Sequence, residues 1–554
     1  MSNVRRLLVR DGGVSRSLLS AGSPVLLERR TLWSALPVVL ALVVYYHLKH
    51  AYLDVATATP WTSVAALGGC LVIAIAGLRV TYRDVSPALG LLIRGVTVVV
   101  GLYTVVAGVV VPPGLAQPYA AIRAVEPVGL VVILGCTIAA LWRPAFAVLP
   151  NVAALAAKSI SAQALGLGPL SPTDYLPLVD LASFGALSIL VWHLVARVPG
   201  LRFICTDDKA SLPRVSTLIF FVILSAHFAN YFYSGVQKIV LDGALPWTWA
   251  DRNPTAMLSE VATVGGFAPL AHWSGLNSAV ISVLWVTTVP ANWAVLITQL
   301  AAVAVVFSRR FTLATIAFYD IAHVAIFIAS GIFFWKWILL NAILISAVYR
   351  LDRTDFRRFG YIACVTVLAS PLVFFVARLG WYDTGAFNRH VVLAEMEDGR
   401  LLEVPSNYFS IASITVAQNR LGTIGPAYPT QTWGTTQSRE VRDAALDDCT
   451  FPGFDEAATH YRGEVAEVER FFRRFHAFRQ PTLDDRGRVD YDLFPHHIWS
   501  NPFAFDAFKE ADKRDIVAYR YGNDRLCFVR ENGRGVLLER WPGPRLRIPV
   551  PAGE

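Results

Sequence analysis

Residues 216–241, STLIFFVILSAHFANYFYSGVQKIVL, are the most informative stretch of the chain. About 20 apolar residues in a helix are enough to cross the hydrocarbon core of a bilayer, and this stretch is longer than that. Two ionisable side chains, His227 and Lys238, interrupt it. Ionisable groups are costly inside a membrane, so they mark candidate functional positions. The stretch therefore predicts a membrane-spanning helix that carries a polar site.

Four polar side chains of this predicted helix share one face. His227, Asn230, Ser234 and Lys238 are three, four and four residues apart, and the neighbouring Gly235 would let a backbone or a ligand approach closely. Desolvation disfavours the ammonium form of a buried lysine and leaves a neutral amine that can accept a proton. Lys238 is therefore a candidate general base. The alternative is a lysine at the helix end that extends its amine into the outer headgroups, and for His227 it is a hydrogen-bonded core histidine.

The chain is apolar on both sides of this helix as far as Gly380. Hydrophobic residues make up 55% of the chain, charged residues 16%, and the mean hydropathy is +0.47. These values are typical of a membrane protein. Two weaker segments are 148–166 and 276–289, and the second meets Pro290, which either kinks one long helix or separates two pieces. The other candidate spans are 31–48, 61–80, 88–112, 125–142, 177–196, 216–241, 291–308, 311–331, 333–349 and 360–380. Eleven crossings are expected, or nine if two weak segments are re-entrant.

Basic residues set the expected orientation. Residues 1–382 carry 27 Lys and Arg against 15 Asp and Glu, and the excess gathers in the tail at 1–30 and in loops at 197–214, 309–310 and 350–358. Positively charged loops stay in the cytoplasm. The tail and these loops are therefore expected to be cytoplasmic and the C-terminal part extracytoplasmic. This sorting explains the basic excess more simply than nucleic-acid binding does.

Residues 381–554 have the composition of a soluble domain, and from Asp383 onward they carry 22 basic and 26 acidic residues. Asp398-Gly399 predicts a hairpin turn, and 439–449 and 464–478 predict helices. Three closing strands are expected, separated by turns at Asn523-Asp524 and Asn532-Gly533. The predicted fold is thus an α-helical integral membrane bundle of 9–11 helices over residues 31–380, followed by an extracytoplasmic α+β domain rich in strands.

Three further groups of residues are candidates for function. Asp320 and His323 lie three residues apart on one helical face, where a carboxylate can hold one imidazole tautomer for proton transfer, or where the two can simply pack between helices. Trp247 anchors at the membrane interface or belongs to a lid over a site at the outer leaflet. Cys449 and Cys527 form a disulfide or remain buried thiols. No cysteine or histidine spacing predicts a metal site.

Two motifs carry a resemblance to a known family. NYFYSGVQKIVLDGALPW, residues 230–247, resembles the signature of the vitamin K-dependent gamma-carboxylases and of their bacterial relatives, the horizontally transferred transmembrane domain proteins. There an aromatic-rich helix carries a small residue, Gly-Val, a variable residue and Lys, and then acidic and Trp positions. The weaker motif is Arg309-Arg310 before a span with His323 and Gly331-Ile332-Phe333. The resemblance covers roughly residues 30–380.

The resemblance implies a reduced vitamin K or related quinone held among the helices, with oxygen and carbon dioxide as co-substrates and no metal. Lys238 would be the catalytic base, with His227, Asn230 and His323 as neighbours of the quinone and Asn151 assisting by a hydrogen bond. A glutamate in a peptide or protein at the outer domain would be carboxylated.

The chain departs from the family pattern at two positions. Asn151-Val152 stands where the family has Asn-His, and Gln299 stands where relatives are often acidic. The rival interpretation is a non-catalytic membrane module that binds a lipid or quinone or assists peptide maturation or export. A transporter is disfavoured because the sequence shows no repeat.

Overall fold

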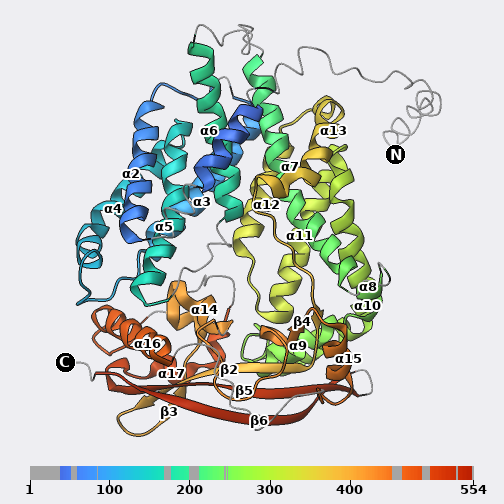
Figure 1. The fold of residues 1–554 in the computed structure, drawn as a ribbon. Coiled ribbons are helices and arrows are strands. Elements are labelled where there is room, and N and C mark those ends of the chain that lie inside the picture. Colours follow the sequence, from blue (N-terminus) through green and yellow to red (C-terminus); the bar gives the residue numbers. More distant parts are fainter. Residues whose placement is uncertain are drawn as a thin grey trace, which may run out of the picture.

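The computed structural model describes residues 36, 38–50, 59–83, 85–167, 176–198, 211–241, 245, 247–418, 420–451, 465–489, 499–531 and 534–551. A bundle of helices stands on a layer built around a β-sheet, so the molecule has a helical half and a strand-containing half (Figure 1). The basic tail at 1–30 and most of the loop at 197–214 lie outside the described residues.

The bundle helices follow the apolar segments of the sequence. They are Val38–His50, α2 (Pro60–Ala76), α3 (Pro87–Ala107), α4 (Tyr119–Ala139), α5 (Val148–Ala164), α6 (Leu176–Arg197), α7 (Ser211–Val240), α10 (Ser274–Val305), α11 (Arg309–Ser330), α12 (Trp335–Val348) and α13 (Arg353–Ala369). Within the described ranges, seven helices are long and apolar enough to cross a membrane: α3, α4, α5 with its leading turn, α6, α7, α10 and α11. Pro290 lies inside the single helix α10.

The last predicted span, 360–380, is wrong in its second half. A capping box of Asp352 and Asp355 starts α13 already at Arg353, and the helix ends at Ala369, two residues before Pro371. Proline lacks the N–H group that would continue the helix. After a short turn the chain runs without helix or strand through residues 373–381, which we call the connecting segment, and enters the outer domain at β1 (Tyr382–Asp383).

A buried ion pair fixes the first part of the connecting segment. Lys49 donates to Asp180 (Nζ to Oδ2, 3.0 Å) and to the carbonyl oxygen of Val373 (3.1 Å). The same Asp180 carboxylate accepts the backbone N–H of Phe375 (2.7 Å) and the hydroxyl of Tyr45. Two helices thereby bond to the segment through one charged pair.

The polar stripe of α7 fixes the next part. Asn230 accepts the N–H of Ala377 (2.8 Å), and Ser234 accepts the N–H of Leu379 (3.1 Å). Lys238 donates to the carbonyl oxygen of Leu379 (2.6 Å). Asn230 and Ser234, four residues apart on the helix, thus bind backbone N–H groups two residues apart in the segment, and Lys238 binds the carbonyl oxygen of the second of these residues.

The strand-containing half, which we call the outer half, contains a four-stranded antiparallel sheet in the order β3-β2-β5-β6. Its strands are β2 (Ala386–Met396), β3 (Leu401–Glu403), β5 (Ile516–Glu531) and β6 (Arg534–Pro549), while β1 pairs with β4 (Thr435–Thr436). The helices here are α14 (Ser413–Ala417), α15 (Arg439–Asp447), α16 (Val465–Arg479) and α17 (Asp506–Glu510). Phe472 of α16 packs on Tyr519 and Tyr521 of β5, which buries that face of the sheet.

The prediction of a turn at Asn523-Asp524 is wrong, because β5 runs through both residues. Neighbouring groups bind the Asp524 carboxylate and the amide N–H of Asn523 inside the sheet. Asn523 donates to the carbonyl oxygen of Pro426 (3.1 Å), and Asp524 accepts from Arg540 (3.0 Å) and Arg545. The irregularity is a register shift between Gly522 and Asp524 against β6. The other predicted turn, Asn532-Gly533, lies outside the described residues.

Two features join elements that are far apart in the sequence. Cys449, after α15, forms a disulfide with Cys527 of β5. Between α7 and α10 the chain forms α8 (Thr248–Arg252) and α9 (Thr255–Val264), and Met257 and Val261 of α9 are buried in one core cluster with Phe387 and Leu526 of the sheet. The two halves therefore share a hydrophobic core.

Replacing Asp180 by Ala should destabilise the fold by about 3–5 kcal/mol, because it leaves Lys49 as an uncompensated buried charge and frees the N–H of Phe375. Thermal unfolding in detergent measures the change. The control is Glu510→Ala, which breaks the exposed pair with Arg488 (2.8 Å) and should cost about 1 kcal/mol at most. Equal effects of the two substitutions would contradict a clamping role for Asp180.

Candidate functional site

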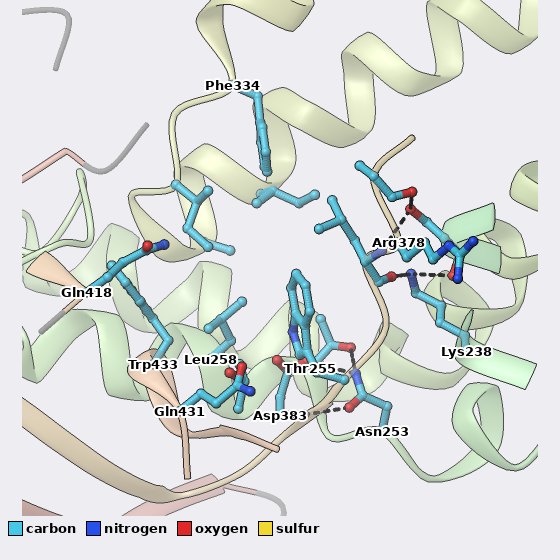
Figure 2. A pocket seen from close by; sticks show the side chains of 18 of the residues that line it. Lys238, Asn253, Thr255, Leu258, Phe334, Arg378, Asp383, Gln418, Gln431 and Trp433 are labelled. Atoms are coloured by element: carbon cyan, nitrogen blue, oxygen red, sulfur yellow. Dashed lines mark hydrogen bonds between the residues drawn. The ribbon is translucent and has the colours of Figure 1, made fainter. Parts of the chain in front are cut away.

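A cavity of about 1460 Å³ lies where the bundle meets the outer half. Its wall includes α7, α10, α11, the connecting segment and the loop at 427–435. At one end the exposed side chains of Ile321 and Ala294 line it, and at the other end the exposed Arg420 and Gln431 do so. Figure 2 shows Lys238 and Arg378 across the open space from Gln418 and Trp433. The cavity thus extends from the apolar helix surface to the outer half.

The structure brings Lys238 to this cavity, with only 9% of the residue exposed. Besides the bond to Leu379, its amine donates to the carbonyl oxygen of Ser234 (3.4 Å), and it lies 5.0 Å from the ring centroid of Trp249. The amine is thus held inside the protein by two backbone carbonyl oxygens and does not extend from the helix end into open space.

A carboxyl group that the sequence did not single out lies at the floor of the cavity (Figure 2). Asn253 donates to Asp383 (Nδ2 to Oδ2, 2.8 Å) and accepts the backbone N–H of the same residue (2.8 Å). Asn292 donates to the carbonyl oxygen of Asn253 (2.8 Å), and its own oxygen accepts from Thr255 (2.7 Å). Desolvation raises the pKa of Asp383 from 3.8 to about 6.

His227 is fully buried behind the cavity wall and is not among the lining residues. Its Nε2 lies 2.8 Å from Oδ1 of Asn341, and the amide of Asn341 donates to Asp320 (2.8 Å). Tyr231 lines the cavity, and its ring stacks on that of Tyr319 with 3.6 Å between the centroids. The hydrogen-bonded core histidine is thus the arrangement in the structure, and the His227 ring contacts two lining residues, Tyr231 (5.2 Å between centroids) and Trp337 (5.6 Å).

The remaining predicted residues divide between the cavity and other places. Asn230 and His323 line it, and the ring of His323 lies 5.0 Å from that of Phe334. Asn151 is buried in α5, donates to Thr97 (3.1 Å) and does not reach the cavity. Trp247 is 45% exposed and lies outside it. Trp249, two residues further along the chain, lines the cavity and donates to the carbonyl oxygen of Trp381 (2.7 Å).

The sequence reasoning missed several lining residues, among them Asn253, Asn292, Trp381, Asp383, His390 and Trp433. One signal was available: Trp381-Tyr382-Asp383 stands where the composition changes and where the chain must leave the helical half. The others come from four separate parts of the chain, and no spacing relates them.

Chemically, the arrangement combines a desolvated amine, a carboxyl group of raised pKa and aromatic walls. Such a site can bind an amphipathic molecule and move a proton at Lys238. Among the described residues, no group of three or more His, Cys, Asp or Glu side chains could hold a metal ion. Comparison of the chain with known protein families, curated proteins and solved structures found no match.

The raised pKa of Asp383 predicts a pH-dependent stability. The folded state binds this proton more tightly than the unfolded state, whose pKa is near 3.8, so stability should rise as the pH falls from about 7 to 4. The gain should be about 2 kcal/mol and absent in Asp383→Asn. Thermal unfolding of both proteins across this range measures it, with Asp443→Asn, half exposed on α15, as control. Parallel profiles for wild type and Asp383→Asn would contradict the prediction.

Proposed function

We propose that this chain is an integral membrane enzyme in which Lys238 acts as a base toward a lipid-soluble reduced quinone, and in which a peptide at the outer half is carboxylated on glutamate. The observation that carries the proposal is the position of the Lys238 amine, desolvated at the wall of a large cavity that extends from the helix surface to the outer half. The resemblance of residues 230–247 to the gamma-carboxylase signature supports the choice of reaction.

The hydrogen bonds of Lys238 are compatible with a neutral amine. A neutral amine has two N–H groups and one lone pair, and the carbonyl oxygens of Leu379 and Ser234 provide two acceptors. With both N–H groups so engaged, the lone pair remains available for a proton from a ligand. The ring of Trp249, whose centroid lies 5.0 Å from the amine, limits the approach of water from that side.

The cavity wall fits a quinone of this kind. Tyr231, Phe334 and Trp337 offer flat aromatic surfaces, and the side-chain oxygen of Gln299 is buried with no hydrogen-bond partner in the described part of the chain. An acceptor of this kind suits a hydroxyl group of a reduced quinone. When bound, a reduced quinone would supply, through oxidation by oxygen to its epoxide, the driving force for removing a glutamate γ-proton so that carbon dioxide can add.

The residues of this chain would then hold and orient the reactants. Lys238 would receive the hydroxyl proton, and the connecting segment keeps the amine at the wall. Ile321 and Ala325 are exposed on α11 and also line the cavity, which suits entry of a lipid-soluble molecule from the bilayer. Asn151 lies outside the cavity and takes no part in this proposal.

One observation favours the rival function, a non-catalytic module that binds a lipid or quinone. Asn230, Ser234 and Lys238 all hydrogen-bond to the connecting segment, and this alone accounts for their presence on α7. The two functions differ in what the loss of the amine does. A module should keep its ligand and lose only stability, whereas an enzyme should lose turnover while still folded.

The test is oxygen-dependent conversion of reduced vitamin K to its epoxide by the purified protein in nanodiscs, with wild type compared with Lys238→Ala. Loss of the base should lower the rate by about 10²-fold or more. The control is Lys336→Met, which removes another buried lysine of the helical half that does not line the cavity, and it should keep the wild-type rate.

Stability and quinone affinity are measured on the same samples, because Lys238→Ala also removes a bond to the connecting segment. A folded wild type that binds quinone and forms no epoxide would favour the module and end the enzyme proposal. Equal rates for wild type and Lys238→Ala would leave the oxygenation without the proposed base.

A further inference from the structure

Trp433 stands out among the residues of the cavity wall at its outer end. Only 4% of the residue is exposed, yet its indole Nε1 is buried and has no hydrogen-bond partner among the residues that the structure describes. Buried tryptophans usually find a partner for this N–H group. Figure 2 shows the side chain facing the open space beside Gln418 and Gln431.

The backbone of Trp433 is strained, with φ 64° and ψ 20°. A bulky residue rarely adopts positive φ, and such strain persists where the surroundings impose it, often at ligand sites. The next residue, Gly434, also has positive φ (69°), and a Cβ atom there would lie 2.6 Å from the carbonyl oxygen of Thr384, so the backbone packs closely at this turn. The indole is further held by Phe267, at 5.0 Å between ring centroids. The fold therefore fixes an unpaired donor at the cavity wall.

The surroundings of this donor indicate what it could bind. Arg420 lines the cavity at this end, whereas Arg378 lies across the open space (Figure 2), and the acidic side chains that line it are Asp383, already bonded to Asn253, and Glu467. Cationic groups and an N–H donor together suit an acceptor oxygen with partial or full negative charge. Arg420 and Gln431 are exposed, so a polar molecule can reach this end from the outer half.

We propose that the indole N–H of Trp433 donates a hydrogen bond to a carbonyl or carboxylate oxygen of the peptide substrate. This assignment rests on the proposed function, because it takes the outer end of the cavity as the peptide site and the helical end as the quinone site. Trp433 is thus a substrate-binding residue for the peptide and has no role in the proton transfer at Lys238.

The test uses Trp433→Phe, which keeps an aromatic ring against Phe267 and removes the N–H group. The probe is a short synthetic peptide with two adjacent glutamates, and its binding to the quinone-free protein in nanodiscs is measured first. The Kd should rise about tenfold, as the loss of one hydrogen bond to a charged or polarised oxygen predicts. In the carboxylation assay the KM for the peptide should rise by the same factor, while the KM for reduced vitamin K stays within twofold.

The matched control is Trp285→Phe. This substitution also removes an indole N–H from the same core cluster, but Trp285 bonds to Glu260 and does not line the cavity. It should leave peptide affinity unchanged. If Trp433→Phe fails to fold, 3-benzothienylalanine at position 433 replaces the N–H by sulfur and keeps the shape of the ring system.

The outcomes separate this inference from the proposed function. A wild type that binds the peptide, with binding weakened in the Trp433 variant, supports the inference even if no epoxide forms. An unchanged Kd in that variant overturns it even if the wild type is an active carboxylase. A rise in the KM for the quinone alone also overturns it, because the donor would then serve the other ligand. A wild type that does not bind the peptide overturns it as well.

Discussion

The backbone of residues 373–381 lies in neither helix nor strand and takes its hydrogen bonds from side chains of the bundle, and much of the structure follows from these bonds. A helix would satisfy its own N–H and C=O groups, but Pro371 ends α13 and the chain continues extended beside the bundle. Side chains therefore provide the partners. The Lys49–Asp180 pair bonds to Val373 and Phe375, α7 bonds to Ala377 and Leu379, and Trp249 bonds to Trp381. Burying polar side chains among apolar helices costs free energy, and these hydrogen bonds to the segment offset that cost.

The same bonds form the candidate site. Because the connecting segment lies along α7, the amine of Lys238 is held between a carbonyl oxygen and Trp249 at the cavity wall. Asp383, two residues after the segment, lies at the floor of the cavity, where Asn253 donates a hydrogen bond to its carboxylate. Stability and chemistry thus depend on one set of contacts. In this arrangement a substitution on α7 changes both, and activity has to be read together with folding.

The helical half follows closely from apolar length, which is a local property of the sequence. Segment 148–166 and the helix through Pro290 form as single elements because packing and helix continuity outweigh one lysine or one proline. Two errors arose where distant partners decide the conformation. Residues 373–380 form no helix, and α7 binds their backbone at Ala377 and Leu379, whereas Asn523-Asp524 remains in β5, where Pro426 and Arg540 bind the side chains. The helical spacing did find Lys238 and Asn230 at the cavity. It could not predict Trp433 or Asn253, which come to line the cavity only when the two halves pack together.

The position of α9 has a consequence for biosynthesis. Met257 and Val261 belong, by sequence, to the middle of the chain, yet they are covered by Phe387, Leu526 and Phe528 of the sheet. A ribosome makes α9 more than 250 residues before it reaches Leu526. Throughout that interval the apolar face of α9 lacks its final neighbours, so the helical half is complete only after nearly the whole chain has been made.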